Sequence, residues 1–402
     1  MKLKFSIFLI SCLLFIAGIG FAQHASLRNE DALKYVDPYI GSDYHGHVFV
    51  GTNVPYGMIQ LGPSNIHKGW DWCSGYHYSD SILIGFSHTH LSGTGCTDLG
   101  DILIMPLNEI RTPRGNQDDI QGGYASKYSH DNEIVRPEYY SLLVDRYGIK
   151  AELTTTDRVG FHRYTYPEGK PASILIDLRE GNGSNAYDSY IRKIDDYTVE
   201  GYRYVKGWSP SRKVYFVLKS NCKIEQFIAY DDNTPKQWEQ LKVESVKSVL
   251  TFGNKKEVKI KVSLSSVSCN NAAMNLKAEI PHWDFDKVVK TSAERWKKEL
   301  SKMTIETKDE SIKTHFPHRS LSYNDSSDTI LRRKRRIQGN KRYDLYRFAE
   351  IQLHYIVAMG YLSSTTSFND YHTTGHGKPC CQLHAFHLPP TGQTPHLAIN
   401  ER

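Results

Sequence analysis

The residues that could do chemistry are concentrated in one segment rich in aromatic, histidine and glycine residues, between about Tyr35 and Pro106. Indole and phenol rings can stack on the apolar face of a sugar, and imidazoles can donate to its hydroxyls. Glycine-rich turns let the backbone approach a ligand closely. The segment therefore predicts carbohydrate binding. The rings that could stack belong to Trp70, Trp72, Tyr76 and Tyr78, and the imidazoles to His47, His88 and His90.

Other interpretations of the same residues remain open. The side chains could pack inside a β-sandwich or against a partner domain instead of contacting a sugar. His45-Gly-His47 and His88-Thr-His90 alternate, so each pair would lie on one face of a strand, and four histidines could bind zinc. Nothing fixes a closed ligand set, however, so we predict no metal site. A Ser-His-Asp triad is not indicated, because the chain has no nucleophile elbow.

The elements that must position these residues are β-strands. From about Asp31 to Asn270, short runs rich in Val, Ile, Tyr, Phe and Thr recur between Gly, Pro, Asn and Asp clusters, which favours a sandwich of antiparallel sheets. Ser173–Asp177 reads as a strand that is buried on both faces. The expected strands include Ile102–Met105, Ala151–Thr155, Gly160–Tyr166, Ala172–Leu178, Lys213–Leu218 and Val258–Leu264.

The hydrophobic period changes after Pro281. One helical stripe then predicts an amphipathic helix, with Lys and Glu on its opposite face. We interpret this helix as a linker to a following helical domain, which would cover its apolar stripe and part of the sandwich. Without that domain, a large apolar patch would be exposed and would favour aggregation. The stripe comprises Phe285, Val288, Val289, Ala293, Trp296 and Leu300.

The N-terminal residues predict export. Lys2 and Lys4 precede an uncharged apolar stretch, and Gly20-Phe21-Ala22 offers a small-x-small cleavage site. This pattern is typical of a secretory signal peptide, residues 1–22, cleaved after Ala22, and is too short for a membrane span. We expect a periplasmic or extracellular protein with no membrane span. The seven cysteines contain no CxxC pair, and their spacing specifies no disulfide.

Several long motifs in fixed order resemble the N-terminal domain of glycoside hydrolase family 92. The resemblance covers about residues 30–313. Because many motifs occur in sequence, it is far more specific than any single glycine-rich match. The motifs are Val36–Gly41, Gly46–Gly51, Val54–Met58, Trp70–Tyr78, Gly85–Gly95, Asp98–Pro106, Pro137–Tyr140, Leu153–Tyr164 and Gly207–Trp208.

The resemblance implies an α-mannosidase similar to α-1,2-mannosidases, acting on the α-mannosides of N-glycans or mannan with inversion. Inversion needs a general acid and, on the opposite face of the sugar, a base that activates water. In the family a C-terminal (α/α)6 barrel carries these carboxylates and the calcium ligands. We therefore expect no catalytic residue and no bound calcium in this chain alone. The stretch Trp70–Cys73 is our candidate for contact with the leaving-group sugar, which adds Cys73 to the candidate substrate-binding residues.

The last part of the chain shows no sustained period of either kind, and the barrel motif Ser-Leu-Trp-Asp-Thr-Tyr-Arg of the family is missing. Read one nucleotide later, permitted codons for Ala358–Phe368 encode Leu-Trp-Asp-Thr-Tyr-Arg-Ala-Leu-His-Pro. Tyr323–Thr329 likewise yields a barrel-like stretch. We therefore predict a frameshift at about Lys313–His315. The basic run Arg332–Arg336, which contributes to the net charge of +6, is then accidental and binds no nucleic acid.

The expected fold is mainly β. A signal peptide at 1–22 precedes an antiparallel β-sandwich at 23–275. A linker helix and the start of the barrel region follow at 276–313, and an irregular, disordered, out-of-frame tail at 314–402. The chain alone would be inactive, and its partners would be α-mannoside glycans. The alternatives are a non-catalytic, lectin-like β-sandwich that binds carbohydrate, and a secreted structural or adhesion protein. The sequence does not give linkage specificity, disulfide pairing or oligomeric state.

Overall fold

The computed structural model describes residues 32–236 and 238–301. Within these residues the strands form two nine-stranded sheets in which every pairing is antiparallel, so the predicted mainly β, two-sheet fold is confirmed. Three short 3-10 turns accompany the strands: η1 (Ala32–Tyr35), η2 (Trp70–Trp72) and η3 (His130–Asn132). The predicted signal peptide at 1–22 and tail at 314–402 lie outside the described residues.

The first sheet is built around β10, which is buried along its whole length as the sequence predicted. β10 pairs with β4 on one side and with β17 on the other. The order of the sheet is β1 (Thr52–Asn53), β2 (Gln60–Asn65), β3 (Ile82–Ser87), β4 (Leu103–Leu107), β10 (Ser173–Asp177), β17 (Val246–Thr251), β14 (Gln226–Asp231) and β15 (Thr234–Lys236), and β5 (Ser126–Lys127) pairs with β3.

The second sheet contains the longest strands. Along β12 every second residue is buried, which is the period expected of a strand with one face on the core. The order of the sheet is β16 (Gln240–Val243), β11 (Ala186–Asp195), β12 (Thr198–Val205), β13 (Arg212–Ser220), β18 (Glu257–Ser265), β9 (Val159–Thr165), β8 (Ile149–Thr155), β7 (Tyr139–Val144) and β6 (Glu133–Arg136).

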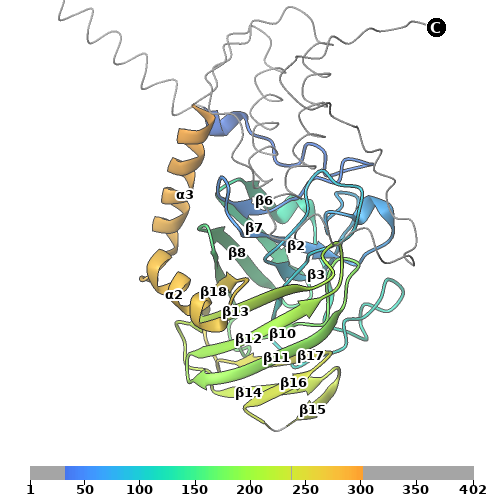
Figure 1. Cartoon of the computed structure of the whole chain (residues 1–402), viewed down its shortest axis with the longest axis vertical. Coiled ribbons are helices and arrows are strands. Elements are labelled where there is room, and N and C mark those ends of the chain that lie inside the picture. The colour runs from blue at the N-terminus through green and yellow to red at the C-terminus, as the bar shows by residue number, and fades with distance from the viewer. Residues whose placement is uncertain (1–31, 237, 302–402) are drawn as a thin grey trace, which may run out of the picture. The chain divides into compact units, whose positions relative to one another are not determined.

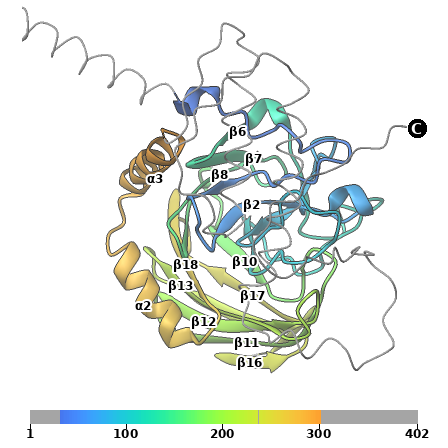
Figure 2. The ribbon, with the colours of Figure 1, turned by 45° about the horizontal axis from the view of Figure 1, so that its top comes forward.

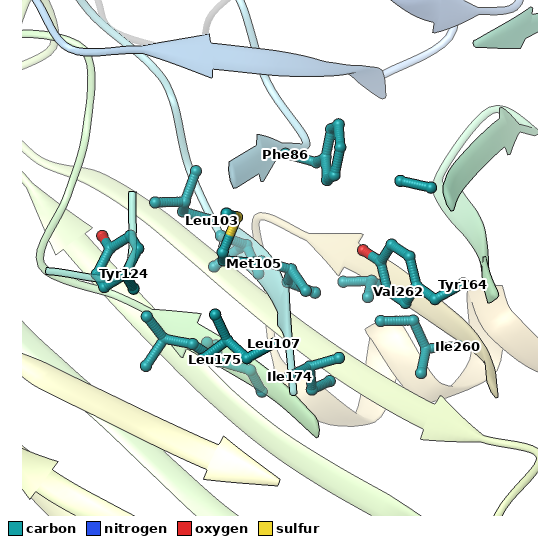
Figure 3. Close-up of a cluster of buried hydrophobic side chains, with 14 of the residues drawn as sticks. Phe86, Leu103, Met105, Leu107, Tyr124, Tyr164, Ile174, Leu175, Ile260 and Val262 are labelled. Carbon is teal, nitrogen blue, oxygen red and sulfur yellow. The ribbon is translucent and has the colours of Figure 1, made fainter. Parts of the chain in front are cut away.

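The core lies between the two sheets, which face each other in Figures 1 and 2. Figure 3 shows how side chains of both sheets share this layer. Phe86 of β3 and Tyr164 of β9 stack with ring centroids 6.5 Å apart, and Met105 of β4 and Val262 of β18 are also fully buried. This continuous apolar layer holds the surface loops on a rigid base.

Two α-helices follow the strands (Figure 1). α3 (Phe285–Leu300) has the bounds of the predicted apolar stripe, and the Asp284 side chain caps it by accepting from the Lys287 backbone N–H. No pattern in the sequence predicted α2 (Cys269–Glu279), which the Ser268 side chain caps. α2 buries only Ala272 and Leu276 along one side, so its sequence carries little helical period.

The apolar stripe of α3 is not exposed, so this part of the prediction was wrong. Phe285, Val288, Trp296 and Leu300 are buried, because α3 packs on β8 and η1 of the same sandwich. The Trp296 indole N–H donates to the Asn53 carbonyl oxygen at 2.8 Å. The sandwich itself therefore covers the face that we had assigned to a following domain.

Candidate functional site

Trp70 forms the exposed centre of the candidate site. It begins η2 after Gly69, whose φ of 129° lies where a side chain would be strained. The indole is 56% exposed, and its N–H donates to the Gly95 carbonyl oxygen at 2.8 Å. A Cβ on Gly95 would come within 3.0 Å of the Trp70 Nε1 atom. The ring is therefore held in place at its polar edge, while its surface stays open to solvent.

His47 lies against the side of this ring. Its backbone has a φ of 53°, which is uncommon for a residue other than glycine, and its ring centroid is 4.2 Å from that of Trp70 in an edge-on arrangement. The side chain is buried, which lowers the pKa of its imidazole. Within the described part of the chain, the buried His47 Nε2 atom has no hydrogen-bond partner, and it lies 3.8 Å from the Asp71 carboxylate.

Asp71 adds a carboxylate beside the indole. The His45 Nδ1 atom lies 2.5 Å from Asp71 Oδ1, and this hydrogen bond lowers the pKa of the carboxyl group. The His45 ring is also 5.2 Å from the Trp70 ring. We call Trp70, Asp71, His45 and His47 the Trp70 cluster. It combines an open aromatic surface, a carboxylate and imidazoles, which are groups that can stack on a sugar and hydrogen-bond to its hydroxyls.

Trp72 belongs to a different contact network. Its indole stacks on the His77 ring with centroids 4.4 Å apart, and its N–H donates to Asp80 at 2.9 Å. Lys68 forms an ion pair with Asp80 at 2.9 Å and lies over the Trp72 ring. Trp72 therefore fixes the loop that carries the Trp70 cluster.

Cys73 and His90 lie beside a small cavity. The Asn182 side-chain amide donates to the Cys73 carbonyl oxygen at 2.6 Å, and the two ring nitrogens of His90 contact the Gln60 carbonyl oxygen at 2.9 Å and Ser64 Oγ at 3.3 Å. Burial lowers the pKa of His90 to about 4. The cavity has a volume of about 30 Å³, room for a water molecule but not for a sugar. Its wall includes Ser64, Asn65, His67, Arg114, Glu180 and Asn182.

His88 lies in the core, away from the Trp70 cluster. It is fully buried, its Nδ1 atom contacts the Ile102 carbonyl oxygen at 2.7 Å, and its Nε2 atom lies 3.0 Å from His162 Nε2. Burial lowers the pKa of His88 to about 4 and that of His162 well below its ordinary value. Both rings are thus neutral, one donating to the other. The structure brings Trp70 and His47 together and does not add His88 to them.

A buried ionic network that the sequence analysis missed supports the loops around the site. Arg203 and Asp101 are fully buried and form an ion pair at 2.5 Å. Arg212 bridges to Asp98 at 2.5 Å and to Asp101 at 3.2 Å, and the Trp208 backbone N–H donates to Asp98. The two aspartates belong to a motif that we had noted. The arginines carried no signal, because a single Arg in a strand usually marks a solvent-facing position.

The described residues do not supply a metal site. Among residues 32–236 and 238–301, no group of three or more His, Cys, Asp or Glu side chains could hold a metal ion. His45, His47, His88 and His90 contact carboxylate, backbone and histidine partners as described above, and do not converge. The calcium that the sequence resemblance implies for an intact enzyme remains a prediction for residues elsewhere. In the same residues, no helix is long and apolar enough to span a membrane.

Comparison with family models gives two matches. The glycosyl hydrolase family 92 N-terminal domain matches residues 35–265, and the glycosyl hydrolase family 92 catalytic domain matches residues 271–329. The first match covers both sheets, and the second covers α2 and α3. The second also continues past the predicted frameshift at Lys313–His315, in a part of the chain outside the described residues.

Solved and curated proteins give similar results. A family 92 α-mannosidase of Bacteroides thetaiotaomicron, solved in complex with mannoimidazole, is 36% identical, with a TM-score of 0.69. The match covers 72% of this chain and 39% of the enzyme. A family 92 inverting mannosidase of the same bacterium is 22% identical and shares the fold, with a TM-score of 0.62. This match covers 71% of this chain and 38% of that mannosidase. An uncharacterized secreted glycosidase of Arthroderma benhamiae is 25% identical over 72% of this chain and 40% of its own length. The chain thus spans about two fifths of the length of these relatives.

Proposed function

The chain belongs to glycosyl hydrolase family 92, and from this membership we propose that it is part of an α-mannosidase. The observation that carries the proposal is its 36% identity, over 72% of its length, to an α-mannosidase solved with mannoimidazole. The chain spans about two fifths of that enzyme, so hydrolysis of α-mannosides is proposed for the whole protein. The secreted fungal relative and the predicted signal peptide support export.

We assign contact with the leaving-group sugar to the Trp70 cluster. The open Trp70 ring offers an apolar surface to the C–H groups of a pyranose. The Asp71 carboxylate beside it, whose side chain is 32% exposed, can accept hydrogen bonds from the hydroxyls at its edge, and the buried His47 packs against the ring. Trp72, Cys73, His88 and His90 support the loops behind the cluster and do not touch sugar in this proposal.

Within this proposal the described residues bind and orient the sugar. None of them acts as the general acid or the general base of the hydrolysis. An inverting hydrolysis needs two carboxyl groups about 6.5–9.5 Å apart across the sugar. Asp71 is bonded to His45 beside the exposed indole, so we assign it to hydroxyl binding rather than to general acid or base catalysis. By holding the leaving-group sugar, the Trp70 cluster fixes the orientation of the bond that is to be cleaved.

The test is a titration followed by NMR. α-1,2-linked mannobiose should shift the indole N–H signal of Trp70, assigned as the signal absent in Trp70→Phe. Trp72, whose indole faces Asp80, is the internal control and should shift less. Titrations with α-1,3- and α-1,6-linked mannobiose rank the linkages. If the Trp70 signal does not move with any mannobiose at millimolar concentration, the assignment of this cluster is wrong.

A further inference from the structure

The outer face of the second sheet presents a strip of aromatic side chains that the Trp70 cluster does not use. Tyr190 of β11 lies opposite Tyr202 of β12, and their rings stack with centroids 5.5 Å apart. Tyr202 in turn stacks on Tyr204 at 4.3 Å. These tyrosines occupy the less buried positions of their strands, whereas the alternate positions face the core. Figure 2 shows β16, β11, β12 and β13 in succession along this sheet.

The strip continues along β11 and β16 to an exposed tryptophan. Arg192 lies opposite Gln240, and the Lys193 backbone N–H donates to the Glu239 carbonyl oxygen. We extend this register by one pair, past the start of β16, and infer that Ile194 lies opposite Trp238 on the outer face. Trp238 is 63% exposed and Ile194 is 45% exposed. We define the outer strip as Trp238, Ile194, Arg192, Tyr190, Tyr202 and Tyr204.

The chemistry of the outer strip fits a neutral oligosaccharide. Arg192 pairs with Glu200 at 2.5 Å and Lys242 with Asp188 at 3.5 Å, whereas Lys213 lies over the Tyr204 ring, so most of the charge on this face is balanced and attracts an acidic partner only weakly. The tyrosine rings stack on one another and present their edges and hydroxyls, whereas the exposed Trp238 indole presents a ring surface. Together these groups match the hydroxyl edges and apolar C–H faces of sugars.

The shape of the outer strip also favours a chain of sugars over a single one. Seven residues of β11, from Asp188 to Ile194, extend over about 20 Å. The tyrosines hold one another in stacks, so little side-chain entropy is lost when a ligand binds. α2 packs on β13 and β18 of the same sheet, beside the strip.

We propose that the outer strip is a second carbohydrate-binding surface, which holds an α-mannan chain at a place separate from the Trp70 cluster. The identity of the ligand rests on the proposed function, whereas the location of the site rests on the geometry above.

The experiment measures binding of the full chain to a soluble α-mannan and to methyl α-mannoside by titration calorimetry. Trp238→Ala should weaken mannan affinity about tenfold and leave methyl α-mannoside binding unchanged. Tyr202→Ala should do the same. Ile110→Ala, which removes another exposed apolar side chain, is the matched control and should bind like the wild type. Because Trp238 is largely exposed, its replacement should leave the melting temperature unchanged.

The outcomes separate the two proposals. If Trp238→Ala binds mannan with wild-type affinity, the proposal that the outer strip binds mannan is wrong. It is also wrong if the wild-type chain does not bind mannan at all. The Trp70 titration with mannobiose, described above, decides the proposed function independently of either result. A tenfold loss in Trp238→Ala but not in Ile110→Ala supports the strip, particularly if Trp70→Ala retains most of its mannan affinity.

Discussion

At the scale of single residues, the site depends on one indole whose polar edge is bonded and whose surface is open. Trp70→Ala should lower the affinity for α-1,2-mannobiose about tenfold, because the stacking surface is lost. It should lower the free energy of unfolding by only about 1 kcal/mol or less, since the side chain is 56% exposed. Calorimetry and urea unfolding measure the two quantities. Unchanged affinity would remove Trp70 from the site, and Ile110→Ala, which removes an exposed apolar side chain elsewhere, is the control.

The buried histidines make a prediction about pH. Burial lowers the pKa of His88 and His90 to about 4, below the value of about 6.5 in an unfolded chain. The unfolded state therefore binds more protons below pH 6.5, so the stabilisation is present above that pH and is lost as the pH falls towards 4. Each unit of pKa difference corresponds to about 1.4 kcal/mol. Urea unfolding should show a lower midpoint at pH 5 than at pH 7.5, with a smaller difference in His90→Gln. A midpoint independent of pH would contradict these assignments.

The histidines show most clearly which parts of the site the sequence could predict and which it could not. Residue type predicted His47 and His88 alike as donors to sugar hydroxyls. Only the fold places His47 beside Trp70 and His88 against His162 in the core. Their difference depends on long-range contacts that no local pattern encodes. The sequence could have predicted Asp71 as a site residue, because it lies between Trp70 and Trp72 in a motif that we had assigned to sugar binding. It could not have predicted the role of Arg203, since a buried arginine resembles an exposed one in sequence.

At the scale of elements, the sequence predicts where α3 begins and ends, but it does not predict which surface α3 packs against. Its period marks the apolar stripe from Phe285 to Leu300, but a period does not reveal what covers the stripe. Trp296 is fully buried against the sandwich and bonded to Asn53. The strands from Ile102 to Leu264 were predicted for the same local reason, by short β-branched and aromatic runs between turns. The sequence did not predict the helix α2, because this helix buries only the side chains of Ala272 and Leu276.

Trp296→Ala tests whether α3 is an integral part of the sandwich. Removing the indole leaves a cavity and removes its hydrogen bond to the Asn53 carbonyl oxygen, and should lower the free energy of unfolding by about 3–5 kcal/mol. Glu294→Ala, on the exposed side of the same helix, should change it by less than about 0.5 kcal/mol. Urea unfolding of both variants measures the difference. Similar stabilities for the two variants would show that α3 contributes little to the fold.

At the scale of the whole molecule, binding and bond cleavage should separate. Every assigned role in the described residues is one of holding or orienting, and the match covers only about two fifths of each relative. We therefore expect the 402-residue chain to release no mannose from α-1,2-mannobiose, with or without added calcium, while still binding it. Quantifying free mannose by chromatography checks this expectation. Measurable release above a heat-denatured control would show that the chain contains its own catalytic carboxylates. Sequencing the coding DNA around Lys313 tests the predicted frameshift separately.

The way in which α3 ends has a mechanical consequence. Arg295 holds Asp157 through two hydrogen bonds of 2.7 and 2.9 Å, Glu299 accepts from the Tyr56 hydroxyl at 2.9 Å, and Leu300 is buried. These contacts therefore fix the position and direction of the C-terminal end of α3, at Ser301, relative to the sandwich. A joint that lets the sandwich swivel relative to the next segment cannot lie within α3, so any pivot must come later in the chain.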